Sequence, residues 1–325
     1  RPDVQALRGF ATILVIFYHL RPQDFRSAFL GADIFIIISG YFTSVSLLSS
    51  SFRPLSFLRR RFVRLVPLFA AVVITVAAVA DELMTSEERA ALKADIPWSL
   101  SFLYNVKPLL TGSDRDTYFT EISRYQPLSH TWSLALEVQL CLLAAWVPDI
   151  FVPPLLYRTF PVSVLMAICV YVMDDQNMYF GTVTLRLWEF LLGCLAHSAP
   201  LHQGVEEFLS SKQSGAALLV VLDAITVSCI PIPTAVTRTL VALLTAGLLR
   251  GKSLPQLLGL HTLGRVSYSV YLLHWPLISF YRFYTDQHDT SLGFDECVLL
   301  FVTSVILAEW LHHSVEEHFR TSSGL

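Results

Sequence analysis

Long apolar runs are the feature that most constrains this chain. A membrane-spanning helix needs about 20 largely apolar residues, with a range of roughly 17–25. Ten segments of the sequence are candidates. They are residues 4–20, 29–48, 62–80, 132–151, 155–173, 181–197, 215–230, 235–249, 266–284 and 294–313. The sequence therefore predicts an all-α polytopic membrane protein, with about ten transmembrane helices in one bundle.

Composition excludes several other classes of protein. Hydrophobic residues make up 54% of the 325, and charged residues 15%, against about 25% in a typical soluble domain. That is too little charge for an ordinary soluble globule and too much apolar sequence for a disordered chain. The net charge of −3 offers no basic excess for a phosphate backbone, so no nucleic acid is expected as a partner.

The five cysteines lie in or beside apolar runs and none form a C-x-x-C pair. This spacing supports neither a disulfide framework nor a zinc site. We therefore expect no metal and no permanently bound cofactor.

The loops between the apolar segments suggest how the chain is organised. One loop, residues 81–131, is sizeable, and we expect residues 1–325 to form a single membrane domain. Most basic residues fall on the side that holds both termini, including the segment 59–64. The positive-inside rule then predicts cytoplasmic termini and an extracytoplasmic loop 81–131, in a membrane that the sequence does not identify. Within this loop, Thr85 and Glu88 have the spacing of a helix capping box.

Arg8 and His19 are ionisable residues near the two ends of the first apolar segment. Their separation of eleven residues puts them on nearly the same helical face, about 16 Å apart along the axis. Ionisable groups inside a membrane usually face a cavity or a partner. The alternative is that both are interfacial flanks, with side chains that extend to water.

Two carboxylates, Asp33 and Glu137, are predicted to lie at a depth similar to that of His19. A carboxylate beside an imidazole orients a general base and stabilises its charged form. His19, Asp33 and Glu137 are therefore candidate catalytic residues. Alternatively, each carboxylate caps a neighbouring helix or pairs with an arginine on the outer side of the membrane.

Arg61 and Arg64 lie three residues apart on one helical face, at the start of the third apolar segment. Guanidinium groups bind phosphate in a bidentate manner, so this segment is a candidate site for a polyphosphate. The simpler interpretation is that these arginines only set the membrane topology.

Two further polar sites within apolar segments have structural interpretations. Arg186 and Glu189 are spaced as a structural intramembrane ion pair within one helix. His274 precedes Pro276, which would kink its helix. A lone histidine in this setting is more often a hydrogen-bonded packing residue than a catalytic one.

Taken together, these segments resemble the acyltransferase 3 family of integral membrane O-acyltransferases. The motifs that carry the resemblance are residues 1–9 with Arg8-x10-His19, 31–42, Arg61-x-x-Arg64, 130–139, 267–276 and 315–319. They occur in the order and at the spacing of the family. One departure is Val138, where the family often has a second acidic residue after the position of Glu137.

The resemblance implies transfer of an acyl group, often acetyl, from cytoplasmic acyl-CoA as co-substrate to a hydroxyl of a carbohydrate or lipid. His19 would be the base or a transient acyl carrier, oriented by Asp33 or Glu137. Arg8, Arg61 and Arg64 would bind the donor. The acyl arm of the donor would pass from these arginines towards His19. The passage for it would be lined by Trp132, Ser133, Ser267, Tyr268 and His274. The implied partners are membrane lipid, acyl-CoA and the carbohydrate or lipid acceptor.

Two other classes of function stay open. A proton-coupled transporter would also place ionisable groups at two depths, but the sequence has no internal repeat and no paired broken helices. A catalytically silent lipid-binding membrane protein is the other alternative, and it would not depend on His19. The acceptor, the acyl chain length, the oligomeric state and the formation of an acyl-histidine intermediate are not specified by the sequence.

Overall fold

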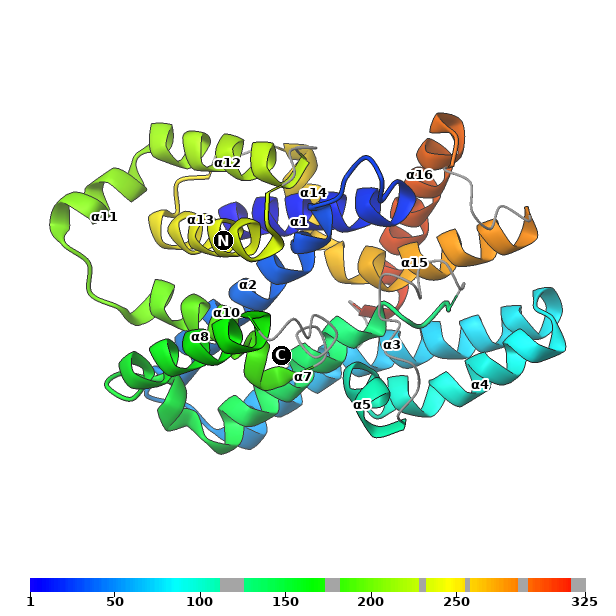
Figure 1. Ribbon diagram of the computed structural model, residues 1–325, viewed down its shortest axis with the longest axis horizontal. Coiled ribbons are helices and arrows are strands. Elements are labelled where there is room, and N and C mark those ends of the chain that lie inside the picture. The colour runs from blue at the N-terminus through cyan, green and yellow to red at the C-terminus, as the bar shows by residue number, and fades with distance from the viewer. Residues whose placement is uncertain (112–125, 173–181, 228–231, 255–257, 286–291, 317–325) are drawn as a thin grey trace.

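The computed structural model describes residues 1–111, 126–172, 182–227, 232–254, 258–285 and 292–316. Within these ranges the regular structure is helical and contains no strand (Figure 1). The α-helices are α1 Pro2–Leu20, α2 Gly31–Leu47, α3 Pro54–Leu83, α4 Ser86–Leu100, α5 Lys107–Thr111, α7 Thr131–Trp146, α8 Leu156–Val172, α10 Val183–Ser198, α11 Gln203–Ser210, α12 Lys212–Val227, α13 Thr234–Gly251, α14 Leu258–Arg265, α15 Ser267–Tyr284 and α16 Phe294–Leu311. Short helical turns are η1 Ala28–Leu30, η2 Tyr104–Val106 and η4 Pro148–Phe151, and a π-helical turn follows α16 at His312–Glu316.

Each of the ten predicted apolar segments falls mainly on a helix, which confirms the all-α class for the described residues. The number of membrane spans is not confirmed. Among the residues that the structure describes, two helices are long and apolar enough to cross a membrane, Ala28–Leu47 and Pro54–Leu83. A third span results if α11 and α12, bent by 74° at their junction, count as one. Helices α7, α10 and α12 have 16 residues each, slightly fewer than the roughly 17–25 of a usual span.

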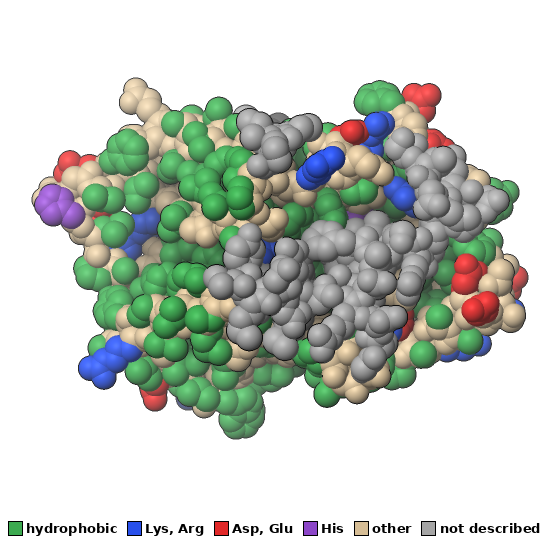
Figure 2. Space-filling model, in the orientation of Figure 1, with side chains coloured by type: hydrophobic (Ala, Val, Ile, Leu, Met, Phe, Trp, Pro, Cys, Tyr) green, Lys and Arg blue, Asp and Glu red, His purple; other side chains and the backbone are tan. Residues whose placement is uncertain are grey.

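The surface of the helical bundle is strongly apolar. In the view of Figure 2, hydrophobic side chains cover most of the described surface over α8 and α12, and charged side chains gather towards the edges. Ile74, Trp146 and Val220 are each about two-thirds exposed, at 68%, 70% and 67%. Soluble monomers rarely expose such continuous apolar surface. This is the surface of a membrane protein.

The segment between α3 and α7 begins with a helical hairpin. The predicted capping box is present, since the Thr85 side chain accepts from the Glu88 backbone and the Glu88 side chain accepts from the Thr85 backbone. The helix that this box caps, α4, extends from Ser86 to Leu100. A reciprocal amide pair between Asn105 and Gln139 holds this segment against α7. Residues 112–125 of the predicted loop 81–131 lie outside the described residues.

Helices α2 and α10 approach so closely that their backbones touch. A Cβ atom added at Gly40 would lie 2.0 Å from the carbonyl oxygen of Phe190. A Cβ atom added at Gly193 would lie 2.1 Å from the carbonyl oxygen of Ile37. Glycine on both helices is therefore a packing requirement, as in the small-residue interfaces of membrane helices.

A buried ion network connects α2 to α10 and α13. Asp33 accepts from Arg186 at 2.5 Å through one carboxylate oxygen and from Arg238 at 2.8 Å through the other. Arg186 also pairs with Glu189 at 2.6 Å, the ion pair that the sequence predicted. The four side chains are between 0% and 3% exposed. Two cations and two anions thus balance one another inside the bundle.

The glycine contact predicts a clear difference between two equivalent substitutions. Gly40→Ala should destabilise the protein by about 1–3 kcal/mol, because the new methyl group meets a backbone carbonyl that cannot move aside. Gly259→Ala is the matched control, since nothing lies within 4 Å of its added Cβ. Thermal unfolding in detergent measures the midpoint of each variant. Equal midpoints would show that the close approach of α2 and α10 is incorrect.

The ion network predicts that Asp33→Asn destabilises the fold. This change leaves two buried arginines with too little negative charge, and breaking a buried ion pair costs about 3–5 kcal/mol. Asp24→Asn is the matched control, because the Arg21–Asp24 pair is exposed and exposed pairs contribute about 0–1 kcal/mol. Chemical or thermal unfolding in detergent measures both. An Asp33→Asn variant as stable as the wild type but inactive would instead favour a catalytic Asp33.

Candidate functional site

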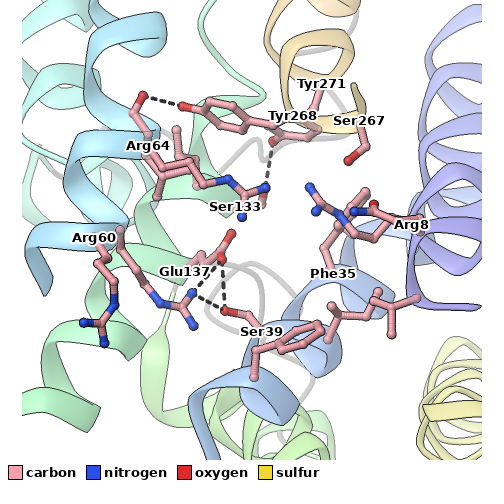
Figure 3. A pocket seen from close by; sticks show the side chains of 18 of the residues that line it. Arg8, Phe35, Ser39, Arg60, Arg64, Ser133, Glu137, Ser267, Tyr268 and Tyr271 are labelled. Carbon is pink, nitrogen blue, oxygen red and sulfur yellow. Dashed lines mark hydrogen bonds and ion pairs between the residues drawn. The ribbon is translucent and has the colours of Figure 1, made fainter. Parts of the chain in front are cut away.

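One cavity of about 490 Å³ lies where α1, α2, α3, α7 and α15 meet (Figure 3). These helices are brought together by packing of α1 against α2 and α15, and of α3 against α7 and α15. The lining includes residues from all five helices, and the polar or charged ones are Arg1, Gln5, Arg8, Ser39, Arg60, Arg61, Arg64, Ser133, Glu137, Ser267, Tyr268 and Tyr271. The cavity therefore draws on segments from the beginning, middle and end of the chain.

The charge of the cavity wall is unbalanced. The described lining residues include five arginines and one carboxylate, that of Glu137. Arg1 is itself paired with Asp3. Charged groups in an apolar bundle normally face a cavity or an ionic partner. The wall is thus suited to an anion with more than one negative charge.

Arg8 and Arg64 extend into the cavity from opposite sides (Figure 3). Arg8 comes from α1 and Arg64 from α3, so the two cations frame a space between different helices. The buried hydroxyl oxygen of Ser267 borders the same space and has no hydrogen-bond partner among the described residues. A ligand oxygen or amide could supply the partner that this hydroxyl lacks.

Glu137, on the lower side of the cavity in Figure 3, pairs with Arg61. Arg61 lies 3.4 Å from the Glu137 carboxylate and donates to Ser39 at 3.1 Å and Thr43 at 3.0 Å. Ser39 in turn donates to Glu137 at 2.9 Å. The sequence placed Arg61 at the cytoplasmic end and Glu137 in the outer half. That separation is wrong, because α3 begins at Pro54 and carries Arg61 into the bundle.

Tyr271 connects the cavity to a group of buried histidines. Its hydroxyl donates to the backbone carbonyl of His130, and it lies 2.6 Å from the Ser133 hydroxyl. Ser267, Tyr271 and His274 are spaced by four and three residues, so they lie along one stripe of α15. The first two line the cavity, and His274 lies one turn further along the helix.

Three histidines lie side by side. They are His19 on α1, His274 on α15 and His130, the N-cap residue of α7. His19 Nδ1 is 2.9 Å from His274 Nε2, and the two ring centroids are 5.0 Å apart. The His130 ring lies 5.8 Å from that of His274. All three side chains are buried. His19 is not among the lining residues of the cavity. Tyr271, which lines it, contacts the His274 ring, and His274 in turn contacts His19.

The structure brings most of the sequence-predicted site residues together, but in two groups. Arg8, Arg61, Arg64, Ser133, Glu137, Ser267 and Tyr268 line the cavity, whereas His19 and His274 form the histidine pair beside it. Asp33 lies in the ion network, and the Trp132 ring faces Arg186 of that network at 5.9 Å. Both carboxylates thus contact arginines, and the rings of His274 and Trp275 lie beside His19.

The sequence did not single out Arg1, Gln5, Arg60 or Tyr271 as site residues. Arg60 was covered by the basic segment 59–64, and Tyr271 by the motif 267–276. The spacing of Ser267, Tyr271 and His274 on one helical face is the signal that could have identified Tyr271.

Comparison with known proteins identifies several relatives of this chain. BcsY of Komagataeibacter xylinus, named provisionally as a membrane-bound transacylase, is 28% identical over 311 residues, which cover 90% of this chain and 77% of that protein. The O-acetyltransferase OatA of Staphylococcus aureus is 33% identical over 213 residues, 60% of this chain and 34% of OatA. YrhL of Bacillus subtilis, named provisionally as a peptidoglycan O-acetyltransferase, is 26% identical over 370 aligned residues, 98% of this chain and 55% of YrhL.

The chain therefore spans about a third of OatA and about half of YrhL. No solved structure matches the chain. The family model of the acyltransferase domain matches residues 1–313. This chain is an acyltransferase that belongs to the acyltransferase 3 family.

Proposed function

We propose that this enzyme transfers an acyl group, most simply acetyl, from cytoplasmic acyl-CoA to a hydroxyl of a carbohydrate or lipid acceptor. The excess of arginine around the cavity is the observation that carries this proposal. Coenzyme A bears three phosphates, and guanidinium groups bind phosphate with charge-assisted, often bidentate, hydrogen bonds. Arg8, Arg64 and Arg61 would hold this polyanion.

The basic segment 59–64 indicates from which side of the membrane the donor enters the cavity. Three arginines of this segment line the cavity, and the positive-inside rule assigns such a segment to the cytoplasm. We infer that the cavity opens to the cytoplasm, where acyl-CoA is made, with both termini on that side. The loop 81–131 would then lie on the opposite side and help to select the acceptor.

The relatives support a cell-envelope glycan as the acceptor class. Two of them are named as O-acetyltransferases, one of peptidoglycan. In our proposal the acceptor hydroxyl attacks the thioester carbonyl and forms the ester bond. His19 takes the proton of that hydroxyl, the carbon–sulfur bond breaks, and the coenzyme thiolate leaves and takes up a proton. His19 could also carry the acyl group transiently, as an acyl-imidazole, before the hydroxyl attacks.

In this proposal the carboxylates of Asp33 and Glu137 have structural roles and take no part in the proton transfer. Glu137 holds Arg61 at the cavity wall, and Asp33 holds the helices together through Arg186 and Arg238. Ser133, Ser267 and Tyr268 line the path of the donor. The thioester end of the donor would have to pass Tyr271 to reach His19.

The donor site predicts a selective loss of affinity. Arg8→Ala and Arg64→Ala should each weaken acetyl-CoA binding roughly 10- to 100-fold, because a hydrogen bond to a charged group contributes about 1.5–3 kcal/mol. Arg158→Ala, on an exposed position of α8, is the matched control and should bind normally. Calorimetry on purified protein in detergent measures the three affinities. Equal affinities would show that these arginines do not bind the donor and only set the membrane topology.

The catalytic role of His19 predicts loss of transfer without loss of donor binding. His19→Ala should lower transfer from radiolabelled acetyl-CoA by about 10²-fold or more, the range of general base catalysis. Its affinity for acetyl-CoA should match that of the wild type, since His19 lies outside the arginine cavity. Transfer at the wild-type rate would exclude His19 from the reaction. If the wild type itself neither bound nor used any acyl-CoA, the proposed donor would be abandoned.

A further inference from the structure

The first turn of α15 forms part of the cavity wall. Ser267 is the first residue of this helix, and both Ser267 and Tyr268 line the cavity. The residue before them, Val266, is the N-cap and provides no side-chain hydrogen bond to the first turn. A helix carries a partial positive charge at its N-terminus. The start of α15 therefore adds to the positive charge of the surrounding arginines.

The Ser267 hydroxyl is a second and independent feature of this wall. The side chain is 0% exposed, and its oxygen has no hydrogen-bond partner among the described residues. Figure 3 shows the side chain directed towards the same space as the Arg8 guanidinium. Buried polar atoms are normally hydrogen-bonded in a folded protein. A ligand in the cavity is therefore expected to supply the partner of this hydroxyl.

The packing of α14 against α1 holds the start of α15 beside Arg8. A Cβ atom added at Gly264 would lie 1.8 Å from a backbone carbonyl oxygen of α1. A Cβ atom added at Gly9 would lie 2.0 Å from a backbone carbonyl oxygen of α14. Arg8 precedes Gly9, and Ser267 follows Gly264 by three residues. The close contact of the two backbones thus places the hydroxyl and the guanidinium on one part of the wall.

We infer that the start of α15 is a phosphate subsite, in which the Ser267 hydroxyl donates a hydrogen bond to a phosphate oxygen. An ionised phosphate oxygen accepts hydrogen bonds, and the N-terminus of a helix favours a phosphate through its N–H groups and its dipole. Arg8 supplies a full positive charge beside it. A carbohydrate hydroxyl could also pair with Ser267, but it would make no use of the positive charge around this position.

This subsite rests on the proposed acyl-CoA donor and names the part of the donor that binds there. Coenzyme A carries a pyrophosphate where its pantetheine arm begins, and a further phosphate on the ribose. Ser267, Tyr271 and His274 follow one stripe of α15, and His274 contacts His19. Because the arm must extend from its phosphate towards His19, the phosphate group at Ser267 is the pyrophosphate. The ribose phosphate is then left to the arginines of α3.

Binding measurements on the purified full chain in detergent test this assignment. Ser267→Ala should weaken the binding of acetyl-CoA about 10-fold or more, the effect of losing a hydrogen bond to a charged group. It should weaken the binding of 3′-dephospho-acetyl-CoA by the same factor, since this analogue retains the pyrophosphate. The affinity for inorganic pyrophosphate, used as a donor-independent probe, should fall as well. In transfer assays the KM for the donor should rise more than kcat falls.

Ser279→Ala is the matched control. Ser279 lies on the same helix, is also 0% exposed, and also has no hydrogen-bond partner for its hydroxyl among the described residues, but it does not line the cavity. This variant should bind all three ligands as the wild type does. Without ligand, Ser267→Ala should unfold at the wild-type midpoint or above, because a buried hydroxyl without a partner does not stabilise the fold.

The three ligands separate the subsite from the proposed donor. Unchanged binding of acetyl-CoA in Ser267→Ala would overturn the subsite, and so would an equal loss in Ser279→Ala. A loss with acetyl-CoA but not with its dephospho analogue would assign Ser267 to the ribose phosphate and overturn the pyrophosphate assignment. If the wild type bound pyrophosphate through Ser267 but did not bind acetyl-CoA, the proposed donor would fail and the phosphate subsite would stand. If it bound neither, both would be overturned.

Discussion

Asp33 accepts hydrogen bonds from two arginines that lie 153 and 205 residues further along the chain. The arrangement of the bundle depends on this buried contact, because it connects the second helix to two helices from the other half of the sequence. With Glu189 the network has equal numbers of cations and anions. An apolar interior accepts charge when it is paired in this way. The network therefore places α2, α10 and α13, and α2 in turn contributes Phe35 and Ser39 to the cavity wall.

The cavity differs from the network because the charges of its described wall are not balanced. Its described wall has several arginines for the single carboxylate of Glu137. Like charges brought together inside a bundle repel one another, so such a wall is stabilised by an anionic ligand. The neighbouring histidine pair is buried, and Nδ1 of His274 contacts a backbone carbonyl of its own helix. In our proposal one region binds the charged donor and the other moves a proton, and α1 and α15 contribute to both.

Much of the fold could be predicted from local pattern. Apolar runs located the helices, and the spacing of Arg61 and Arg64 placed both in one cavity. Contacts between distant segments could not be predicted in the same way. Nothing in the spacing of Asp33, Arg186 and Arg238 shows that they meet, because helix pairing is set by three-dimensional packing. Depth was also misjudged for Arg61, since the apolar run was taken as the whole helix and α3 starts eight residues earlier.

The pairing of His19 with His274 was missed for the same reason. Each histidine is isolated in its own segment, and a lone histidine in an apolar helix most often packs rather than reacts. The two become a unit only because α1 packs against α15. The carboxylates nearest to His19 in predicted depth were the reasonable partners from sequence, but arginines on other helices occupy them.

The central claim is that the arginine cavity holds the donor with its acyl end directed towards His19. A cryo-electron microscopy structure of the enzyme with a non-hydrolysable acyl-CoA analogue tests it most directly. The account predicts phosphate density between Arg8 and Arg64, and the acyl carbonyl beyond Tyr271 within reach of His19. Phosphates bound at any other surface, with the arginine cavity empty, would contradict it.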